Sequence, residues 1–249
     1  MNFFQSWQFA IPQLLPAIGL CAAFAFLAWG LRAVTAGAAL TGVGLSVVLC
    51  LAAGPAALIP IVTVFLLTLV TTRIGHRKKE RLGVAERRRG RGAPQILANV
   101  GVAAICAAPL IFPGHAHHIL LAGTSAALAE AAGDTVSSEL GQAFGGIPRL
   151  ISTWRRASPG QDGGITVAGT FFALCAMILV CVACEWANLL RPEFYWTVLS
   201  AAFLGTVVDS LLGATLERPG RLGNNGVNFS STAFSAIFAM GVLFLQGWR

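Results

Sequence analysis

Acidic residues occur within stretches of this sequence that are otherwise apolar enough to lie inside a membrane. Asp134 follows the apolar run 119–132 in GDTVSSEL (133–140), and Asp209 lies in VVDSLLGA (207–214). A carboxylate inside a bilayer costs roughly 2.5–3.5 kcal/mol on insertion scales, so such a residue usually marks a pathway or a site. Two acids on different helices could share a cation. Each could instead cap or hydrogen-bond a neighbouring helix, or pair with an arginine.

A third acid, Glu130, lies four residues before Asp134. Residues four apart share one face of a helix, so Glu130 would lie on the same face as Asp134. It would be one turn deeper in the membrane, either as part of the same site or in a buried packing role.

The segment 73–91 is strongly basic. It holds nine of the 17 Lys and Arg residues against two Glu, which accounts for the whole net charge of +7. The positive-inside rule places such a segment in the cytosol, where it also attracts anionic headgroups. Alternatively, Lys78 and Lys79, or their neighbours Arg77 and Arg81, neutralise a phosphate at the membrane surface. Nucleic-acid binding is not expected, because no nucleic-acid recognition module accompanies these basic residues.

Two polar motifs could bind an anion. The backbone N–H groups of GQDGG (160–164) could hold a phosphate. Asn224, Asn225 and Asn228 introduce the last apolar run. Their amides could bind an anion at the positive end of a helix, or an asparagine could act as the N-cap.

The composition is that of a membrane protein. Of 249 residues, 56% are hydrophobic and 11% are charged, whereas soluble domains carry about 25% charged residues. Several uncharged runs of about 18–22 residues could each cross a hydrocarbon core of roughly 30 Å. These runs are continuous rather than alternating, which favours helices over a β-barrel. The sequence therefore predicts an all-α, polytopic membrane protein with a single domain, 1–249.

About eight membrane-spanning helices are predicted, and they position the polar residues. Their hydrophobic runs occupy residues 9–29, 34–53, 55–72, 94–112, 118–139, 165–186, 195–216 and 226–247. With the basic loop 73–93 in the cytosol, the motif loops 140–164 and 217–225 face the cytosol too, and both termini face outward. At 1.5 Å per residue, Asp134 lies about 9 Å and Asp209 about 10 Å from the cytosolic ends of their spans. The expected location is the cell (inner) membrane, with multiple passes.

Several motifs occur in an order that resembles a known family. They are TTRIG…KKERLGVAE…RRG…PQILANVGVAA (71–104), GDTVSSELG (133–141), PRLISTW…GQDGGIT (148–166), DSLLGA (209–214) and NNGVN (224–228). This series is similar to the integral membrane family of eukaryotic transmembrane protein 19 and the plastid phytyl-phosphate kinase.

The resemblance implies a lipid kinase that transfers a phosphoryl group from a nucleoside triphosphate, such as CTP, to an isoprenoid lipid phosphate like phytyl phosphate. The family's acidic motif falls on Gly133, Asp134, Thr135, Ser138 and Glu139, its glycine loop on Gly160, Gly163 and Gly164, and its asparagine motif on Asn224, Asn225 and Asn228. Relatives often have NGDTWASE and GTNGG where this chain has AGDTVSSE and GQDGG. The identities of the prenyl chain and the nucleotide, and the oligomeric state, are left open.

The mechanism predicted from both the residues and the resemblance depends on Mg²⁺. Asp134, Glu139 and Asp209 are predicted to hold Mg²⁺, with Asp162 assisting. Lys78, Lys79 and Arg149 would neutralise the transferred charge. The 160–164 loop and Asn225 would position the transferred phosphoryl group. Catalysis of phosphoryl transfer depends chiefly on positioning of the substrates and on electrostatic stabilisation.

Two alternatives use the same acids differently. A secondary transporter or cation carrier would use intramembrane carboxylates and glycine-interrupted helices. It would also need polar groups on both faces of the membrane, whereas the predicted outer loops are short and carry few. A scaffold without catalysis would leave the clustered acids unexplained.

Overall fold

The fold is almost entirely helical, as predicted. The computed structural model describes residues 3–85, 90–112 and 117–248, so residues 86–89 of the predicted basic loop lie outside the described residues. The elements are α1 (Phe3–Gly30), α2 (Ala36–Ala53), η1 (Pro55–Ala57), α3 (Leu58–Arg73), α4 (His76–Arg81), α5 (Ala93–Ala107), η2 (Ala108–Ile111), α6 (His117–Phe144), β1 (Arg149–Leu150), β2 (Gly164–Ile165), α7 (Val167–Trp186), η3 (Pro192–Phe194), α8 (Tyr195–Leu212), the π-helix η4 (Gly213–Glu217) and α9 (Asn224–Leu245).

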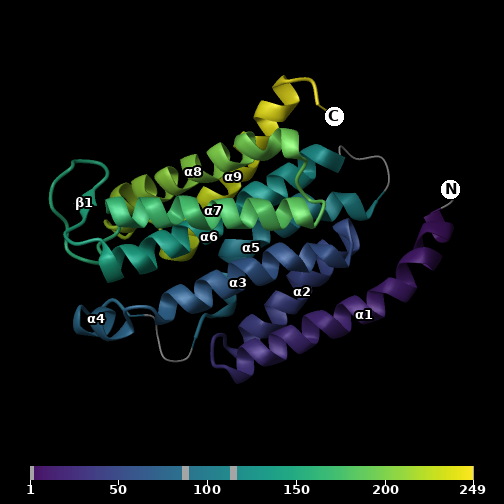
Figure 1. The fold of residues 1–249 in the computed structure, drawn as a ribbon, viewed down its shortest axis with the longest axis horizontal. Helices are drawn as coiled ribbons and strands as arrows, with labels where there is room; N and C mark the ends of the chain where they lie inside the picture. The colour runs from purple at the N-terminus through teal and green to yellow at the C-terminus, as the bar shows by residue number, and fades with distance from the viewer. Residues whose placement is uncertain (1–2, 86–89, 113–116, 249) are drawn as a thin grey trace.

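Helix α6 is the centre of the bundle. It packs against α3, α5, α7, α8 and α9, while α1 lies at the outside and packs on α2 (Figure 1). Buried residues occur along almost the whole length of α6, from Ile119 to Ala143. Because other helices surround it, α6 can carry polar side chains that would be costly on a lipid-facing helix.

Six helical segments in the described chain are long and apolar enough to cross a membrane. They are Ala36–Ala53, Pro55–Arg73, Ala93–Ile111, Val167–Trp186, Pro192–Glu217 and Asn224–Leu245, and Leu15–Gly30 is a shorter apolar helix. These segments match seven of the predicted spans, and α6 occupies the place of the remaining one.

Helix α6 extends past the end of its predicted membrane span. The predicted span ended at residue 139, where polar residues accumulate, but α6 continues to Phe144. Asp134 therefore lies about 15 Å from the end of its helix, and its depth of about 9 Å below the end of the membrane span stays a prediction. The polar residues do not end the helix, because their side chains are enclosed by other helices while the backbone hydrogen bonds continue.

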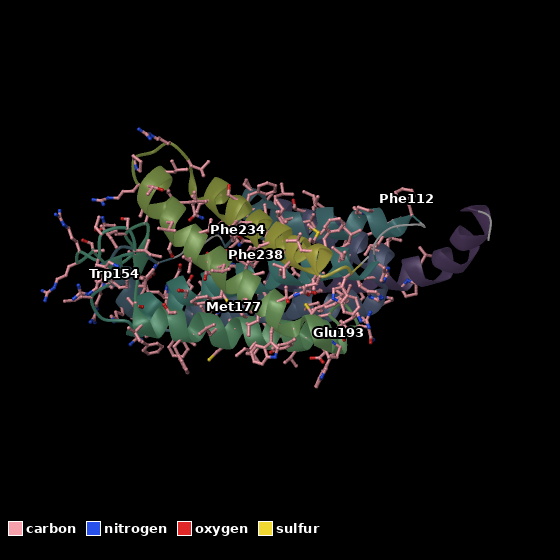
Figure 2. The ribbon with its side chains drawn as sticks, turned by 90° about the horizontal axis from the view of Figure 1, so that it is seen from above. Phe112, Trp154, Met177, Glu193, Phe234 and Phe238 are labelled. Carbon is pink, nitrogen blue, oxygen red and sulfur yellow. The ribbon has the colours of Figure 1, made fainter. Side chains whose placement is uncertain are left out.

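The polar motifs gather at one end of the bundle. Helix α4 and strand β1 lie at this end, whereas α1 starts and α9 ends at the opposite one (Figure 1). Trp154 marks the polar end, and Phe112 and Glu193 lie toward the other (Figure 2). Strands β1 and β2 form a short antiparallel ladder in this region. The shared location of the motifs fits the predicted topology; the cytosolic orientation of this end stays a prediction.

A glycine on α8 allows close packing at the centre of the bundle. A Cβ added at Gly205 would overlap Ser235 Oγ and lie 2.7 Å from Glu130 Cγ and 3.1 Å from the backbone oxygen of Ser231. Helices α6, α8 and α9 therefore approach one another here more closely than any side chain would allow.

We expect Gly205→Ala to destabilise the protein, because overpacking a close helix contact costs about 1–3 kcal/mol. Gly101→Ala on α5 is the matched control, since Gly101 is also a buried helix residue but an added Cβ meets nothing within 4 Å. It should be neutral or slightly stabilising, because alanine is the better helix former. Thermal unfolding can be followed with a thiol-reactive dye, because the six free cysteines are buried or half-buried. Equal melting temperatures for the two variants would contradict the close-packing argument.

Candidate functional site

A polar cavity of about 520 Å³ opens between α5, α6, α8, α9 and the loop that follows α6. Five acids line it: Asp134, Glu139, Asp162, Asp209 and Glu217. Arg91 is the one basic residue on its wall within the described part of the chain. A cavity with this charge balance attracts cations, and it can hold a polyphosphate only together with cations.

The carboxyl groups of Asp134 on α6 and Asp209 on α8 lie within hydrogen-bonding reach of each other. The Ser231 hydroxyl on α9 donates to Asp209 Oδ2 at 3.0 Å. Two carboxylates this close repel each other unless they share a proton or bind a cation. The structure thus brings together the two acids that the sequence placed at similar depth on different helices.

Glu130 lies one helical turn below the Asp134–Asp209 pair. Its side chain is 1% exposed, it lies near the Ser231 hydroxyl, and its Oε1 has no hydrogen-bond partner among the described residues. It does not form part of the cavity wall. An unsatisfied acceptor therefore lies directly beneath the two aspartates.

Glu139 is held by other partners than Asp134 and Asp209. Its Oε2 accepts from Lys79 Nζ at 2.5 Å, and its Oε1 accepts from the Thr72 hydroxyl at 3.0 Å. Five residues turn an α-helix through about 500°, so Glu139 points some 140° away from Asp134 around α6. The three acids that were predicted to bind one metal ion together do not converge.

Lys79 is fully buried, and its ammonium group has no donor left for a phosphate. Besides Glu139, its Nζ donates to the backbone oxygens of Thr71 at 3.0 Å and Thr72 at 2.9 Å. A lysine ammonium has three donors, and all three are used. Thr71 and Thr72 belong to the last turn of α3, where carbonyls lack helical partners. Lys79 therefore ties α4 to the end of α3 and to α6, in place of the predicted phosphate contact.

Three other predicted contacts also lie outside the cavity wall. Lys78 Nζ donates to the backbone oxygen of Ala143 at 2.7 Å, near the negative end of α6. Arg149 is exposed, and its Nη1 donates to the backbone oxygen of Trp154 at 2.9 Å. Asn225 is exposed in the first turn of α9 and contributes to a different, apolar surface.

The 160–164 loop lies on the cavity wall, and its glycines have a packing role. Gly160 and Gly163 both have φ of +75°, which favours glycine. A Cβ on Gly163 would lie 2.6 Å from Ala214 N, and one on Gly160 would lie 3.0 Å from Val84 Cβ. The N–H of Gly164 donates within the loop to Gln161 O. Close packing thus explains both glycines, Gly163 against η4 and Gly160 against Val84, and it holds Asp162 beside the cavity.

Asn224 and Asn228 line the cavity, and Asn228 has a partner that the sequence analysis missed. Asn228 Nδ2 donates to Asn99 Oδ1 at 2.9 Å, which links α9 to α5. The N-cap of α9 is Gly223, with no side-chain cap hydrogen bond. Asn224 is therefore not the N-cap of α9, which was the alternative to anion binding.

Arg91, Gln95 and Asn99 form a face of the cavity that the sequence analysis did not identify. A partial signal was present, because Gln95 and Asn99 are four residues apart and so share one face of α5, whereas Arg91 lies just before the N-cap Gly92. Arg91 interacts electrostatically with Asp134.

The backbone of Arg91 is held by the α1–α2 connection. Its N–H donates to Ala33 O at 3.0 Å, and its own oxygen accepts from Thr35 N at 3.0 Å. Gly90 has φ of +74°, and a Cβ there would lie 2.5 Å from Ala33 O. The glycine thus allows the two segments to come close enough to position the arginine.

The donor chemistry of the site suits Mg²⁺ shared with a substrate. Among the described residues, no three His, Cys, Asp or Glu side chains are grouped so that they could hold a metal ion. Mg²⁺ is usually bound by one or two carboxylates together with waters and substrate phosphates. Asp134 and Asp209 supply such a pair.

Comparison with known proteins identifies the family. The profile described as "Integral membrane protein DUF92" matches residues 19–236. The chain belongs to this family. It is a multi-pass integral membrane protein, as its helices also indicate.

Relatives in the family come from bacteria, archaea and plants. An uncharacterized membrane protein of Synechocystis sp. is 32% identical, over 80% of this chain and 78% of its own length. An uncharacterized membrane protein of Methanocaldococcus jannaschii is 31% identical, over 74% of each chain. Protein VTE6, chloroplastic, of Arabidopsis thaliana is 29% identical, over 78% of this chain and 61% of its own length. No solved structure matches the chain.

The buried ion pair gives a stability prediction. Lys79→Met should lower the free energy of unfolding by about 3–5 kcal/mol, because it leaves the Glu139 carboxylate buried without its counter-charge. The double variant Lys79→Met/Glu139→Met should recover most of the loss, because hydrophobic replacement of a buried pair is often neutral. Thermal unfolding of the purified protein in detergent measures both.

Lys78→Met is the matched control, since Lys78 is exposed and donates one hydrogen bond. Its cost should be about 1 kcal/mol. A Lys79→Met variant no less stable than this control would show that the buried pair does not hold the helices together.

Proposed function

We propose that this protein is a membrane-embedded isoprenyl-phosphate kinase that transfers a phosphoryl group from a nucleoside triphosphate to a lipid monophosphate. The observation that carries the proposal is the paired carboxyls of Asp134 and Asp209 in a polar cavity that Arg91 also lines. The family resemblance, to a group that includes a plastid phytyl-phosphate kinase, supplies the reaction class and favours a phytyl-like acceptor and CTP.

The acids of the cavity suit a nucleotide that arrives with Mg²⁺. Asp134 and Asp209 would hold the metal ion, which supplies charge neutralisation for the phosphate oxygens and a template for them. Asp162, on the loop beside η4, lies on the same wall and can bind metal-coordinated water. The amides of Asn224 and Asn228 can donate hydrogen bonds to phosphate oxygens.

The transfer itself asks little covalent chemistry of the protein. The bond from the terminal phosphorus of the donor to its bridging oxygen breaks, while a bond forms to an oxygen of the acceptor phosphate, and the nucleoside diphosphate leaves. A phosphate monoester is already ionised at neutral pH, so no side chain needs to remove a proton. Arg91 stabilises the charge on the transferred group, since a guanidinium can bind two phosphate oxygens at once.

Asp134→Asn and Asp209→Asn should each lower kcat/KM by at least about 10²–10³-fold, because each removes a carboxylate that neutralises charge in the transition state. The assay offers the purified protein phytyl, geranylgeranyl, farnesyl or undecaprenyl phosphate with CTP or ATP and Mg²⁺, and measures diphosphate product. Chelation of Mg²⁺ should abolish turnover.

Glu193→Gln serves as the control for these variants, because Glu193 pairs with Arg191 toward the opposite end of the bundle (Figure 2). Full activity in both aspartate variants would refute the kinase assignment. Cation flux into sealed vesicles, without lipid-dependent nucleotide turnover, would instead support the carrier.

Arg91→Gln should reduce kcat by about 10²–10³-fold, as expected when a preorganised donor to the developing charge is removed. Arg221→Gln is the control, since Arg221 is exposed and does not line the cavity. Steady-state kinetics with saturating nucleotide measures both. Equal kcat values in the two variants would exclude Arg91 from the transfer step.

A further inference from the structure

A second hollow, of about 640 Å³, lies beside the cavity, between α1, α2, α3 and the start of α5. Most of its wall is apolar and includes Phe24, Ala38, Val64, Phe65 and Leu69. The three helices occupy the side of the bundle away from α8 and α9 (Figure 1). We call this hollow the α1–α3 groove. Its volume falls in the range of about 300–1,000 Å³ that is typical of ligand sites.

One end of the α1–α3 groove is basic. Arg32 follows α1, Arg73 ends α3, and Arg91 precedes α5, and all three line this hollow. Within the described residues, no carboxylate forms an ion pair with Arg32 or Arg73. The groove therefore combines a long apolar wall with three guanidinium groups at one end, which matches an amphiphile with an anionic head.

The groove and the cavity share part of their walls. Arg91 and Asn99 line both. An anionic head bound at the basic end of the groove would thus reach Arg91, which also lines the cavity and interacts electrostatically with Asp134. No other arginine or lysine in the described residues lines both spaces.

We propose that the α1–α3 groove binds the isoprenoid tail of the acceptor, with its phosphate held by Arg32, Arg73 and Arg91 at the border with the cavity. This inference rests on the proposed kinase function and adds the place and orientation of the lipid substrate. The nucleotide then occupies the cavity from the side of the 160–164 loop, and the two phosphates meet at Arg91.

Charge distinguishes this occupant from a bilayer phospholipid. A phosphate monoester carries about −1.5 to −2 charges at pH 7, whereas a phosphodiester headgroup such as that of phosphatidylglycerol carries one. Three arginines suit the more highly charged monoester, and guanidinium groups bind its oxygens in pairs. An isoprenyl monophosphate is therefore the better match for the basic end.

Two glycines of α2 provide a matched kinetic test. A Cβ on either Gly42 or Gly44 meets no atom within 4 Å, but Gly42 lines the groove and Gly44 does not. Gly42→Phe should raise the KM for geranylgeranyl phosphate at least tenfold, leave the KM for the nucleotide unchanged, and affect the shorter geranyl phosphate much less. Gly44→Phe should behave as wild type. Equal KM values for geranylgeranyl phosphate in the two variants would overturn the inference.

A binding experiment without nucleotide separates this inference from the kinase assignment. Geranylgeranyl phosphate with a photoreactive group on its tail is cross-linked to the full-length protein, and the labelled peptides are mapped by mass spectrometry. Label should appear on α1, α2 or α3, and unlabelled geranylgeranyl phosphate should compete much better than geranylgeraniol or phosphatidylglycerol. Arg32→Gln/Arg73→Gln should weaken competition by the phosphate at least tenfold without changing competition by the alcohol.

Each result has a distinct meaning. Label outside α1–α3, or equal competition by phosphatidylglycerol, would overturn the inference, and in the latter case the groove holds bilayer lipid. Specific label in the groove from a protein without any kinase turnover would remove the proposed function while the lipid site stands. Kinase turnover together with label outside the groove would leave the proposed function standing and remove the lipid site.

Discussion

The structure depends on the burial of carboxylates along α6. An uncompensated charge in the interior of a membrane protein costs several kcal/mol, so an acid on this helix can carry its charge only with a partner or beside a polar space. Glu139 is neutralised by Lys79, and Asp134 faces the cavity beside Asp209 and Arg91. Enclosure by five other helices keeps these groups away from lipid. The central position of α6 thus follows from its polar residues.

The basic segment contributes more to the architecture than its charge suggests. Lys79 uses all its donors on α3 and α6, and Lys78 donates to the end of α6. Gly75, with φ of +67°, brings α4 into contact with Ala143. These contacts join the start of the segment to the bundle, and Arg91, at its far end, is held by the α1–α2 connection. The segment that gives the predicted topology signal therefore also supplies one residue of the cavity wall, Arg91.

In the proposed kinase reaction, the two hollows would bind different substrates at the membrane surface. The polar cavity, with five acids, suits a water-soluble substrate accompanied by cations, and the α1–α3 groove suits a lipid. In that proposal, only their common border would need to hold the reacting phosphates. In such an arrangement the lipid substrate need not leave the bilayer, because its tail stays among helices while its head reaches the cavity.

Composition and hydrophobic patterning were enough to establish the all-α membrane class and the approximate helices, because burial in lipid demands long apolar runs and leaves few alternatives. They also identified Asp134 and Asp209, since an intramembrane carboxylate is conspicuous whatever surrounds it. The interaction partner of each charged side chain could not be predicted from composition and patterning. Whether Lys79 binds a phosphate or Glu139 depends on the packing of α4 against α3 and α6, which are distant in sequence, and Arg91 reaches the cavity only because Gly90 packs against Ala33. Pairing in three dimensions decides these roles, because the energy of a charge depends on its neighbours in space, and the chain order does not specify them.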